Sequence, residues 1–552
     1  MKPNLPEPLR SLTIALLGLF VIELLVCGLY RGPRPIPDEP VNEQLPAHDF
    51  QDFSAERAVS IHEELFPPKP HPAGSVENLL VRDRLAELLR HRGWQVEIQT
   101  AIVESDVKVV LHNVLAHHSQ LDSFKTRPLV LATHYDSCRT GPGAGDAGGC
   151  VAAVIEAARA LFWTDTNFRP DLQRPVYLLF TDGEELGLLG AQQFVKRHPL
   201  SARKPIVLNF DARGTSGPVV MYETHAGNRS AIAAWSNELA RPRITGSLFT
   251  AVYRTMPNGS DFTVFQRAGW QGFNFAIIDG AHRYHMPDDT LANLDRRSLQ
   301  HFGEHALNLA RRIATTDSDL PQTPDDAVYF DVLGVFVLHY PLSWCLPLSI
   351  AAFVLICGAN RKSLLVRDGF RVFVRVGIVS LVVASTSAAV GWFLSRLLRD
   401  VGLLPRSFVW YGHGLSAALW LVSAAISLGI TRWQLRRCPA ETVWSVLWLW
   451  WTLAGISVTV FAPQFSHLLI WPALLAVTLS MTRWSVPTKM VLATSGSAVL
   501  HVPVLHLLSI ALGPSAGALL CPAFALALLP LYPALALSTV ESTLDSALTP
   551  AR

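Results

Sequence analysis

The sequence has little net charge and few cysteines. It has 46 Lys and Arg residues and 44 Asp and Glu residues, and the formal net charge of +2 gives no argument for nucleic-acid binding. Of the seven cysteines, only Cys138 and Cys150 lie in the central, less apolar part of the chain. A disulfide between them would need an oxidising compartment and a geometry that spacing alone does not show, so two free thiols are the default expectation.

Hydrophobic residues are abundant, at 50% of the 552 residues, and this composition favours a membrane protein. The run from Leu12 to Leu29 is almost unbroken and long enough to cross a bilayer. We expect a retained anchor there and not a signal peptide, because no clear small-x-small cleavage site follows it. Together with this anchor, the later apolar runs predict about eight crossings. These later runs lie at residues 335–357, 372–394, 409–430, 442–461, 466–481, 489–511 and 517–540.

Basic residues in the loops predict how these crossings are oriented. The loops after the second, fourth and sixth crossings carry Lys and Arg, among them Arg361, Arg432 and Lys489, whereas two of the three alternate loops carry none. The positive-inside rule therefore places both termini in the cytoplasm and the central segment outside it. That segment would face the periplasm or the exterior in a bacterium, or the lumen of the endoplasmic reticulum in a eukaryote.

Short apolar runs and amphipathic stretches alternate in the central segment. Runs such as Val176–Phe180 and Ile206–Phe210 are typical of buried strands, and Arg297–Ile313 has apolar residues at helical spacing. This alternation predicts an α/β fold, a three-layer sandwich on a mostly parallel sheet. Because such sheets bind ligands at the carboxyl ends of their strands, we expect the chemistry there.

Metal-ligating residue types follow three of the predicted strands. The stretch "LVLATHYDS" ends with His134 and Asp136, "PVYLLFTDGEE" ends with Glu184 and Glu185, and "PIVLNFDARG" contains Asp211. Taken alone, a Glu-Glu pair is usually a solvated turn, and a histidine at a strand end is usually a satisfied polar group. Together at one sheet edge, however, these carboxylates would repel one another unless positive charge lies among them.

Two more residues of the same types lie in neighbouring loops. Asp146 lies in the glycine-rich stretch "GPGAGDAGGC" before a predicted helix, where it would also serve as an ordinary N-cap. His285 lies in "RYHMPDDT", after the predicted strand at 273–278. Bound divalent cations would compensate this concentration of carboxylates.

These motifs resemble the co-catalytic di-zinc aminopeptidases of peptidase family M28, clan MH. The resemblance covers roughly residues 50 to 315, including "HPAGSVENLLVRDRLAELL" and "NFDARGTSGPVVMYET". The layout of anchor, peptidase segment and multi-span region, together with "YFDVLGVFVLHYP", is similar to the endoplasmic-reticulum metallopeptidase branch of that family. The resemblance implies the zinc exopeptidase fold, a peptide substrate and two zinc ions per chain.

The same resemblance implies a role for each ligand. His134 and Asp211 would hold one zinc ion, Glu185 and His285 would hold the other, and Asp146 would bridge the two ions. This set is implied by the family pattern, since mixed histidine and carboxylate ligands alone would also suit manganese or cobalt.

Three further residues would complete the catalytic site. Asp136 would orient the ring of His134 from outside the metal shell. Glu184 would be the general base that takes a proton from water. Tyr284 would stabilise the developing oxyanion, as a tyrosine does in the carboxypeptidase relatives, or would pack at the pocket wall.

The resulting organisation joins a peptidase domain to a membrane domain, with lipid bilayer and peptide as the expected partners and no indication of an oligomeric state. From the N-terminus, the parts are a cytoplasmic end with the anchor (1–30), a Pro-rich tether (31–50), the extracytoplasmic zinc peptidase domain (51–318), a linker (319–334), a membrane domain of about seven helices (335–541) and a cytoplasmic tail (542–552).

Two other functions are compatible with this fold. A glutaminyl cyclase would share the sheet and bind a single zinc ion, although the pair His134–Asp136 and Asp211 favour two metals. A non-catalytic membrane scaffold would be expected to have lost metal ligands, and this sequence retains them.

Ionisable residues also occur in or near the apolar runs, where each is a functional hypothesis by default. Glu23 lies in the anchor, and the histidines show no metal-ligand spacing; His501 and His506 do not share a helical face. We interpret these histidines as helix-packing or interfacial groups. They are His339, His413, His467, His501 and His506.

Overall fold

The computed structural model describes residues 7–29, 33, 52–104, 108–118, 124–162, 171–239, 241–243, 246–321, 323–366, 368–404 and 413–536. The chain divides into two compact units, which we call the sheet unit (Leu29–His339) and the helical unit (Met1–Gly28 with Tyr340–Arg552). Apart from residue 33, the predicted tether at 31–50 lies outside the described residues, as does the predicted tail at 542–552.

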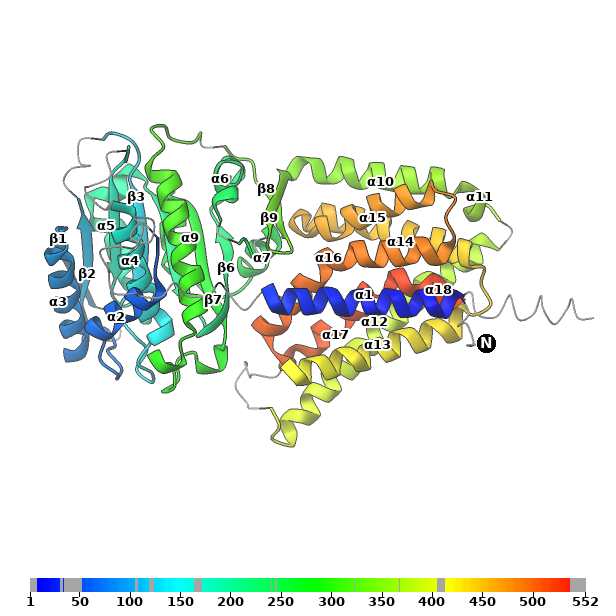
Figure 1. Cartoon of the computed structure of the whole chain (residues 1–552), viewed down its shortest axis with the longest axis horizontal. Helices are drawn as coiled ribbons and strands as arrows, with labels where there is room; N and C mark the ends of the chain where they lie inside the picture. Colours follow the sequence, from blue (N-terminus) through cyan, green and yellow to red (C-terminus); the bar gives the residue numbers. More distant parts are fainter. Residues whose placement is uncertain are drawn as a thin grey trace, which may run out of the picture. The chain divides into compact units, whose positions relative to one another are not determined.

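The sheet unit is built on a seven-stranded mixed sheet (Figure 1) with the strand order β1-β2-β4-β3-β5-β7-β6. The four strands β4, β3, β5 and β7 run parallel, while the outer strands pair antiparallel. The predicted α/β fold class is therefore confirmed, with parallel strands at the centre of the sheet. The strands are β1 (Gln95–Glu104), β2 (Lys108–His117), β3 (Leu129–His134), β4 (Val176–Thr181), β5 (Ile206–Ala212), β6 (Ser216–Thr224) and β7 (Gln271–Asp279).

Helices cover both faces of this sheet and complete the three layers. Neighbouring residues of β3 face opposite ways: Leu129 and Leu131 join the core under one set of helices, and Val130 and Ala132 join the core under the other. All four are fully buried, as expected for a central strand with helices on both sides. The first set is α2 (Ala55–Leu65), α4 (Cys150–Phe162) and α9 (Arg296–Ala314), and the second is α5 (Leu189–Arg197) and α8 (Asp261–Arg267).

The sequence of α9 explains its position. Asp295 caps the helix by accepting from the backbone N–H of Arg297 at 2.8 Å. Phe302, Leu309 and Ile313 then recur on one face and are fully buried. Helix α9 consequently packs against α4 and against β3 and β6 of the sheet.

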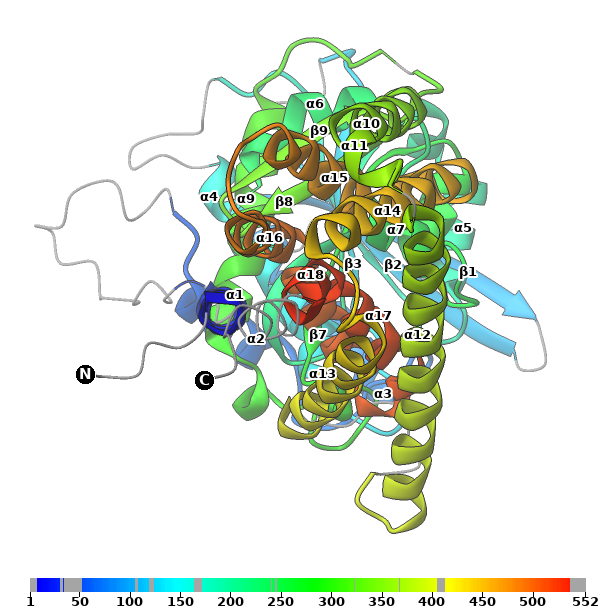
Figure 2. The same ribbon diagram turned by 90° about the vertical axis from the view of Figure 1, so that its right-hand side faces the viewer.

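The helical unit contains seven segments long and apolar enough to cross a membrane, counted over the residues that the structure describes. The sequence predicts eight crossings, and the one that the structure does not support is the run at 466–481. This run forms α15, which has only 14 residues, fewer than the roughly 20 that span a bilayer. Helix α12, with 32 residues, forms one long side of the unit in Figure 2. The helices are α1 (Glu7–Leu29), α10 (Cys345–Ala359), α11 (Arg361–Leu364), α12 (Gly369–Asp400), α13 (His413–Leu435), α14 (Ala440–Phe461), α15 (His467–Ser480), α16 (Val486–Leu512), α17 (Gly517–Ala527) and α18 (Tyr532–Ala536).

The first crossing of the C-terminal region begins later than predicted. The sequence places it at 335–357, but β9 (Phe336–Pro341) pairs with β8 (Ala327–Val332), and the apolar helical span runs from Leu342 to Ala359. A short apolar run can form either a strand or the first turn of a helix, so the sequence did not separate the two. In the structure the strand β9 ends at Pro341, before the helical span begins.

Candidate metal centre

The candidate metal ligands gather at the carboxyl ends of the parallel strands. His134 is the last residue of β3, and its register partner in β4 is Thr181. Glu184 follows β4 in the next turn, and Asp211 is the penultimate residue of β5. Parallel neighbours deliver these side chains to one edge, as the sequence predicts.

One group of ligand atoms surrounds the ring of His134. Its Nε2 lies 3.2 Å from Asp146 Oδ1 and 3.5 Å from Asp211 Oδ1. His134 and Asp146 are buried, and the Asp211 side chain is 17% exposed. Two carboxylates and one imidazole nitrogen, all within 4.8 Å of one another, form a group that could hold a metal ion.

A second group surrounds the ring of His285. Its Nε2 lies 2.9 Å from Glu185 Oε2 and 3.2 Å from Asp146 Oδ2. The two oxygens of the Asp146 carboxylate therefore face different histidines, one in each group. His285 itself has a left-handed backbone with a φ of 58°, a conformation that costs free energy in a residue with a side chain.

The sulfur of Cys138 joins the second group. Its Sγ and the ligand atoms of Glu185 and His285 all lie within 4.8 Å of one another. Both Cys138 and Cys150 are free thiols in the structure, as the sequence predicts by default, but the sequence did not place Cys138 beside the candidate ligands.

Asp136 supports both groups. The Nδ1 of His134 lies 3.0 Å from the Asp136 carbonyl oxygen and 3.5 Å from Oδ1 of its carboxylate. A proton held on Nδ1 by these acceptors leaves the Nε2 lone pair free for a metal. The same carboxylate accepts from the backbone N–H of Glu184 at 3.1 Å and of Glu185 at 3.3 Å. Asp136 thus fixes the Glu-Glu turn as well as the histidine.

Two further aspartates position the site and were not identified from the sequence. Asp182 accepts from the backbone N–H of His112 at 2.8 Å and from the Asn78 side chain at 3.2 Å, which ties the start of the Glu-Glu turn to β2 and α3 (Val76–His91). Asp289 accepts from the backbone N–H of Gly145 at 2.7 Å and of Asp146 at 3.3 Å. The only available signal for Asp289 was its place four residues after His285.

The charge balance of the site favours a bound cation. Burial raises the pKa of Glu184 well above its ordinary value, and burial raises that of Glu185 to about 7. Burial alone would lower the pKa of His285, but hydrogen bonds to Asp146 and Glu185 raise it to about 10. Among the described residues, the buried Oε1 of Glu185 has no hydrogen-bond partner. Buried carboxylates that outnumber the histidines among them, together with an unpartnered oxygen, fit a metal site.

Tyr284 lies beside this second group. Its ring stacks on that of His285 with centroids 3.8 Å apart, and the residue is 37% exposed. Burial of the hydroxyl, together with the charges of Asp146 and Asp211, raises the pKa of Tyr284. The phenol therefore keeps its proton and remains a hydrogen-bond donor.

The clustered ligands form a site that could hold metal ions, and comparison with known families points to a metallopeptidase domain. Residues 113–310 match the model of Peptidase family M28, so the chain carries a peptidase domain of that family. The matched range includes all five candidate ligands.

Curated relatives include membrane proteases. A vacuolar membrane protease of Candida albicans is 28% identical over 274 residues, which are 48% of this chain and 31% of the relative. The human endoplasmic reticulum metallopeptidase 1 is 27% identical over 214 residues, which are 38% of this chain and 23% of the relative. The match thus spans less than a third of either relative.

Solved structures similar to the chain include an aminopeptidase and a glutaminyl cyclase. The aminopeptidase from Aneurinibacillus sp. strain AM-1 is 14% identical with a TM-score of 0.38, and the comparison covers 51% of this chain and 99% of that one. The glutaminyl cyclase of Porphyromonas gingivalis is 18% identical with a TM-score of 0.38, over 46% of this chain and 96% of that one.

Proposed function

We propose that the chain is a membrane-bound zinc exopeptidase that removes residues from the free amino terminus of peptides. The observation that carries this proposal is the Asp146 carboxylate, whose two oxygens lie 3.2 Å from the Nε2 atoms of His134 and His285. A carboxylate shared between two histidines, each with a carboxylate of its own, suits a pair of metal ions joined by a bridging ligand.

The candidate peptidase centre of each chain would hold two zinc ions. His134 and Asp211 would ligate one ion, Glu185 and His285 the other, and Asp146 both. When bound, zinc supplies Lewis acidity and lowers the pKa of water toward neutrality. The family match at residues 113–310 supports zinc over other divalent ions that imidazole and carboxylate ligands accept.

The remaining residues would move protons and hold the reacting groups in place. Glu184 would take a proton from the attacking water and return it to the leaving amine, as a general base and then a general acid. Asp136 would keep Glu184 in position through the backbone hydrogen bond of 3.1 Å. The Tyr284 hydroxyl would donate to the developing oxyanion.

The peptidase domain would work outside the cytoplasm. The basic residues around Arg361 and Arg432 support this side, because they lie at or just after the C-terminal ends of the second and fourth spans, α10 and α13, when α1 is counted as the first. Lys489 gives no such support, since α15 is too short to count as a crossing and Lys489 lies within α16. The domain would then cleave peptides in the periplasm, at the cell exterior, or in an organelle lumen.

The test uses the full chain, purified in detergent with zinc, and one set of peptides with free or acetylated amino termini. We expect cleavage of the free peptides alone. Glu184→Gln should retain its zinc and lose cleavage, because the amide cannot accept the proton. Equal activity of this variant would remove Glu184 from the mechanism.

A peptide that begins with glutamine separates the remaining candidates. Loss of ammonia without cleavage, with one zinc ion at the ligands His134, Asp146, Glu185, Asp211 and His285, would identify a glutaminyl cyclase. Absence of zinc from these ligands would favour the non-catalytic scaffold.

A further inference from the structure

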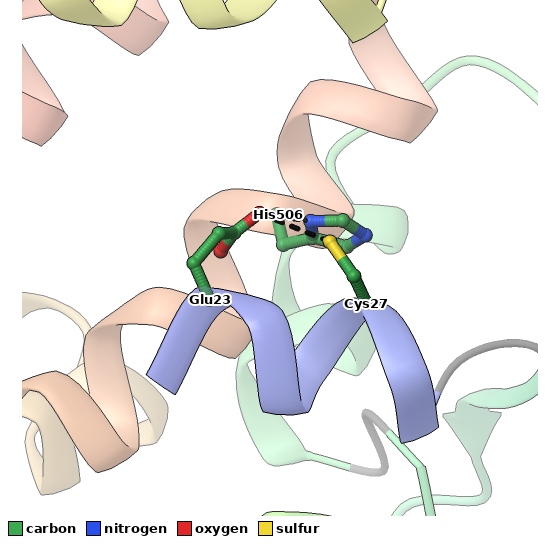
Figure 3. A group of neighbouring side chains, drawn as sticks. All are labelled: Glu23, Cys27 and His506. Atoms are coloured by element: carbon green, nitrogen blue, oxygen red, sulfur yellow. Dashed lines mark hydrogen bonds and ion pairs between the residues drawn. The ribbon is translucent and has the colours of Figure 1, made fainter. Parts of the chain in front are cut away.

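A second group of potential metal ligands lies in the helical unit, formed by Glu23, Cys27 and His506 (Figure 3). Glu23 and Cys27 are four residues apart on α1, so their side chains share one face of that helix. His506 projects toward them from α16. The ligand atoms of all three residues lie within 4.8 Å of one another.

The contacts within this group already converge on the Glu23 carboxylate. The ring nitrogen Nδ1 of His506 lies 2.8 Å from Glu23 Oε1, and the Cys27 thiol donates to the same oxygen at 3.5 Å. The second oxygen, Oε2, is buried and has no hydrogen-bond partner among the residues that the structure describes. An ionisable carboxylate with an unpartnered oxygen in an apolar helix is costly unless a positive charge compensates it.

The three residue types select one class of cation. A thiolate and an imidazole are ligands for borderline transition metals, whereas magnesium and calcium take oxygen ligands almost exclusively. Zinc accepts cysteine, histidine and carboxylate together in tetrahedral sites, and three protein ligands leave a fourth position for water.

Helix α1 has little packing to hold it in the helical unit. Only 11% of the residues in the apolar stretch of α1 are buried, compared with 56% of those in the apolar stretch of α14. Small side chains bring α1 close to α16, since a Cβ on Gly18 would lie 3.3 Å from Ser495 Oγ. A metal ion coordinated from both helices would add a strong link where apolar contacts are few.

We propose that Glu23, Cys27 and His506 form a zinc-class metal site that joins α1 to α16. The site lies in a different unit from the candidate peptidase centre and shares no ligand with it, so it does not depend on the proposed function.

The first test counts zinc in the full chain, purified in detergent and passed through gel filtration. The double variant His134→Ala/His285→Ala disables the candidate peptidase centre and should retain one zinc equivalent. Adding Cys27→Ser or His506→Ala should remove that equivalent. Cys357→Ser and His501→Ala are the matched controls, because they replace the same residue types in α10 and α16, and they should leave it in place.

Cobalt provides a second test that keeps the peptidase ligands intact. A cobalt–thiolate bond gives a charge-transfer band in the near ultraviolet. Cys138 lies beside Glu185 and His285 and could contribute such a band, so the experiment is done in Cys138→Ser. We expect the band to remain in this variant and to disappear when Cys27→Ser is added. A band unchanged by Cys27→Ser, or zinc content unchanged by Cys27→Ser and His506→Ala, would overturn the site.

Discussion

Asp289 holds the backbone of Asp146, from which it is separated by 143 residues in sequence, through a hydrogen bond of 3.3 Å. The other oxygen of its carboxylate accepts from Gly145 at 2.7 Å, and its carbonyl accepts from Ala144 at 3.1 Å. A glycine-rich loop has many accessible conformations, and these three bonds select the one that presents Asp146 to both histidines.

Asp289→Asn should therefore weaken zinc binding, although Asp289 contacts no metal in the proposed site. An amide oxygen replaces only part of the carboxylate's acceptors, and loss of such a supporting group typically lowers metal affinity or activity about 10- to 100-fold. Competition with a chromophoric chelator would measure the affinity. Asp288→Asn is the control, because that side chain is 55% exposed. Equal affinity in Asp289→Asn and Asp288→Asn would show that the loop holds Asp146 without Asp289.

Tyr284→Phe should lower kcat and leave zinc content unchanged. The phenyl ring preserves the stack on His285, whose centroid lies 3.8 Å away, and only the hydroxyl donor is lost. Removal of one oxyanion donor typically costs about 10² to 10³ in kcat. Steady-state kinetics with a free peptide would separate kcat from KM. A variant with wild-type kcat but a lower unfolding temperature would assign Tyr284 to packing.

His305→Leu should make the free energy of unfolding fall less steeply as the pH decreases below neutrality. Burial lowers the pKa of His305 well below its usual value, and the nearby charges of His301 and Arg243 lower it further. The unfolded chain then binds a proton below a pH of about 6.5 while the folded chain does not, so the free energy of unfolding falls as the pH decreases.

The loss amounts to at most about 1.4 kcal/mol per pH unit for one such group. Thermal unfolding of the full chain at neutral pH and at mildly acidic pH, with and without the substitution, would measure it. His91→Leu is the control, since the His91 side chain is 74% exposed and should change neither value. An unaltered pH dependence in His305→Leu would contradict the prediction.

Gly391→Val should destabilise the helical unit. A Cβ on Gly391 of α12 would lie 2.2 Å from the backbone oxygen of Gly517 in α17, so the two helices touch through glycine. Overpacking of this kind costs about 1–3 kcal/mol. Melting followed by size-exclusion chromatography in detergent would detect the loss. Gly429→Val is the matched control, because nothing lies within 4 Å of its Cβ position, and both variants melting alike would refute the close contact.

The sequence predicted the parts of the site that local pattern specifies. His134, Glu184 and Asp211 directly follow or end short apolar runs, and the rule that parallel strands share a carboxyl edge was enough to bring them together. The fold class followed from the same alternation of strands and helices.

Other parts depend on tertiary contacts that leave no local signal. Asp289 resembles any loop aspartate, and its role is visible only once Gly145 and Asp146 lie against it. His506 lies 483 residues from Glu23, so no local sequence pattern connects the two, and their contact is visible only once α1 lies beside α16. The run at 466–481 was located correctly, since α15 spans His467–Ser480, but its 14 residues are too few to count as a crossing.

The order of synthesis has a consequence for the helical unit, which takes α1 from one end of the chain and all its other helices from beyond residue 339. Glu23 and His506 are 483 residues apart, a length that a ribosome makes in roughly 25 to 100 seconds. During that time α1 would lie in the bilayer without its partner helix, while the sheet unit emerges and has all of its own strands available for folding. Helix α1 therefore cannot be joined to the membrane part before α16 has been made, and damage to α16 would leave a folded peptidase domain on an unassembled anchor.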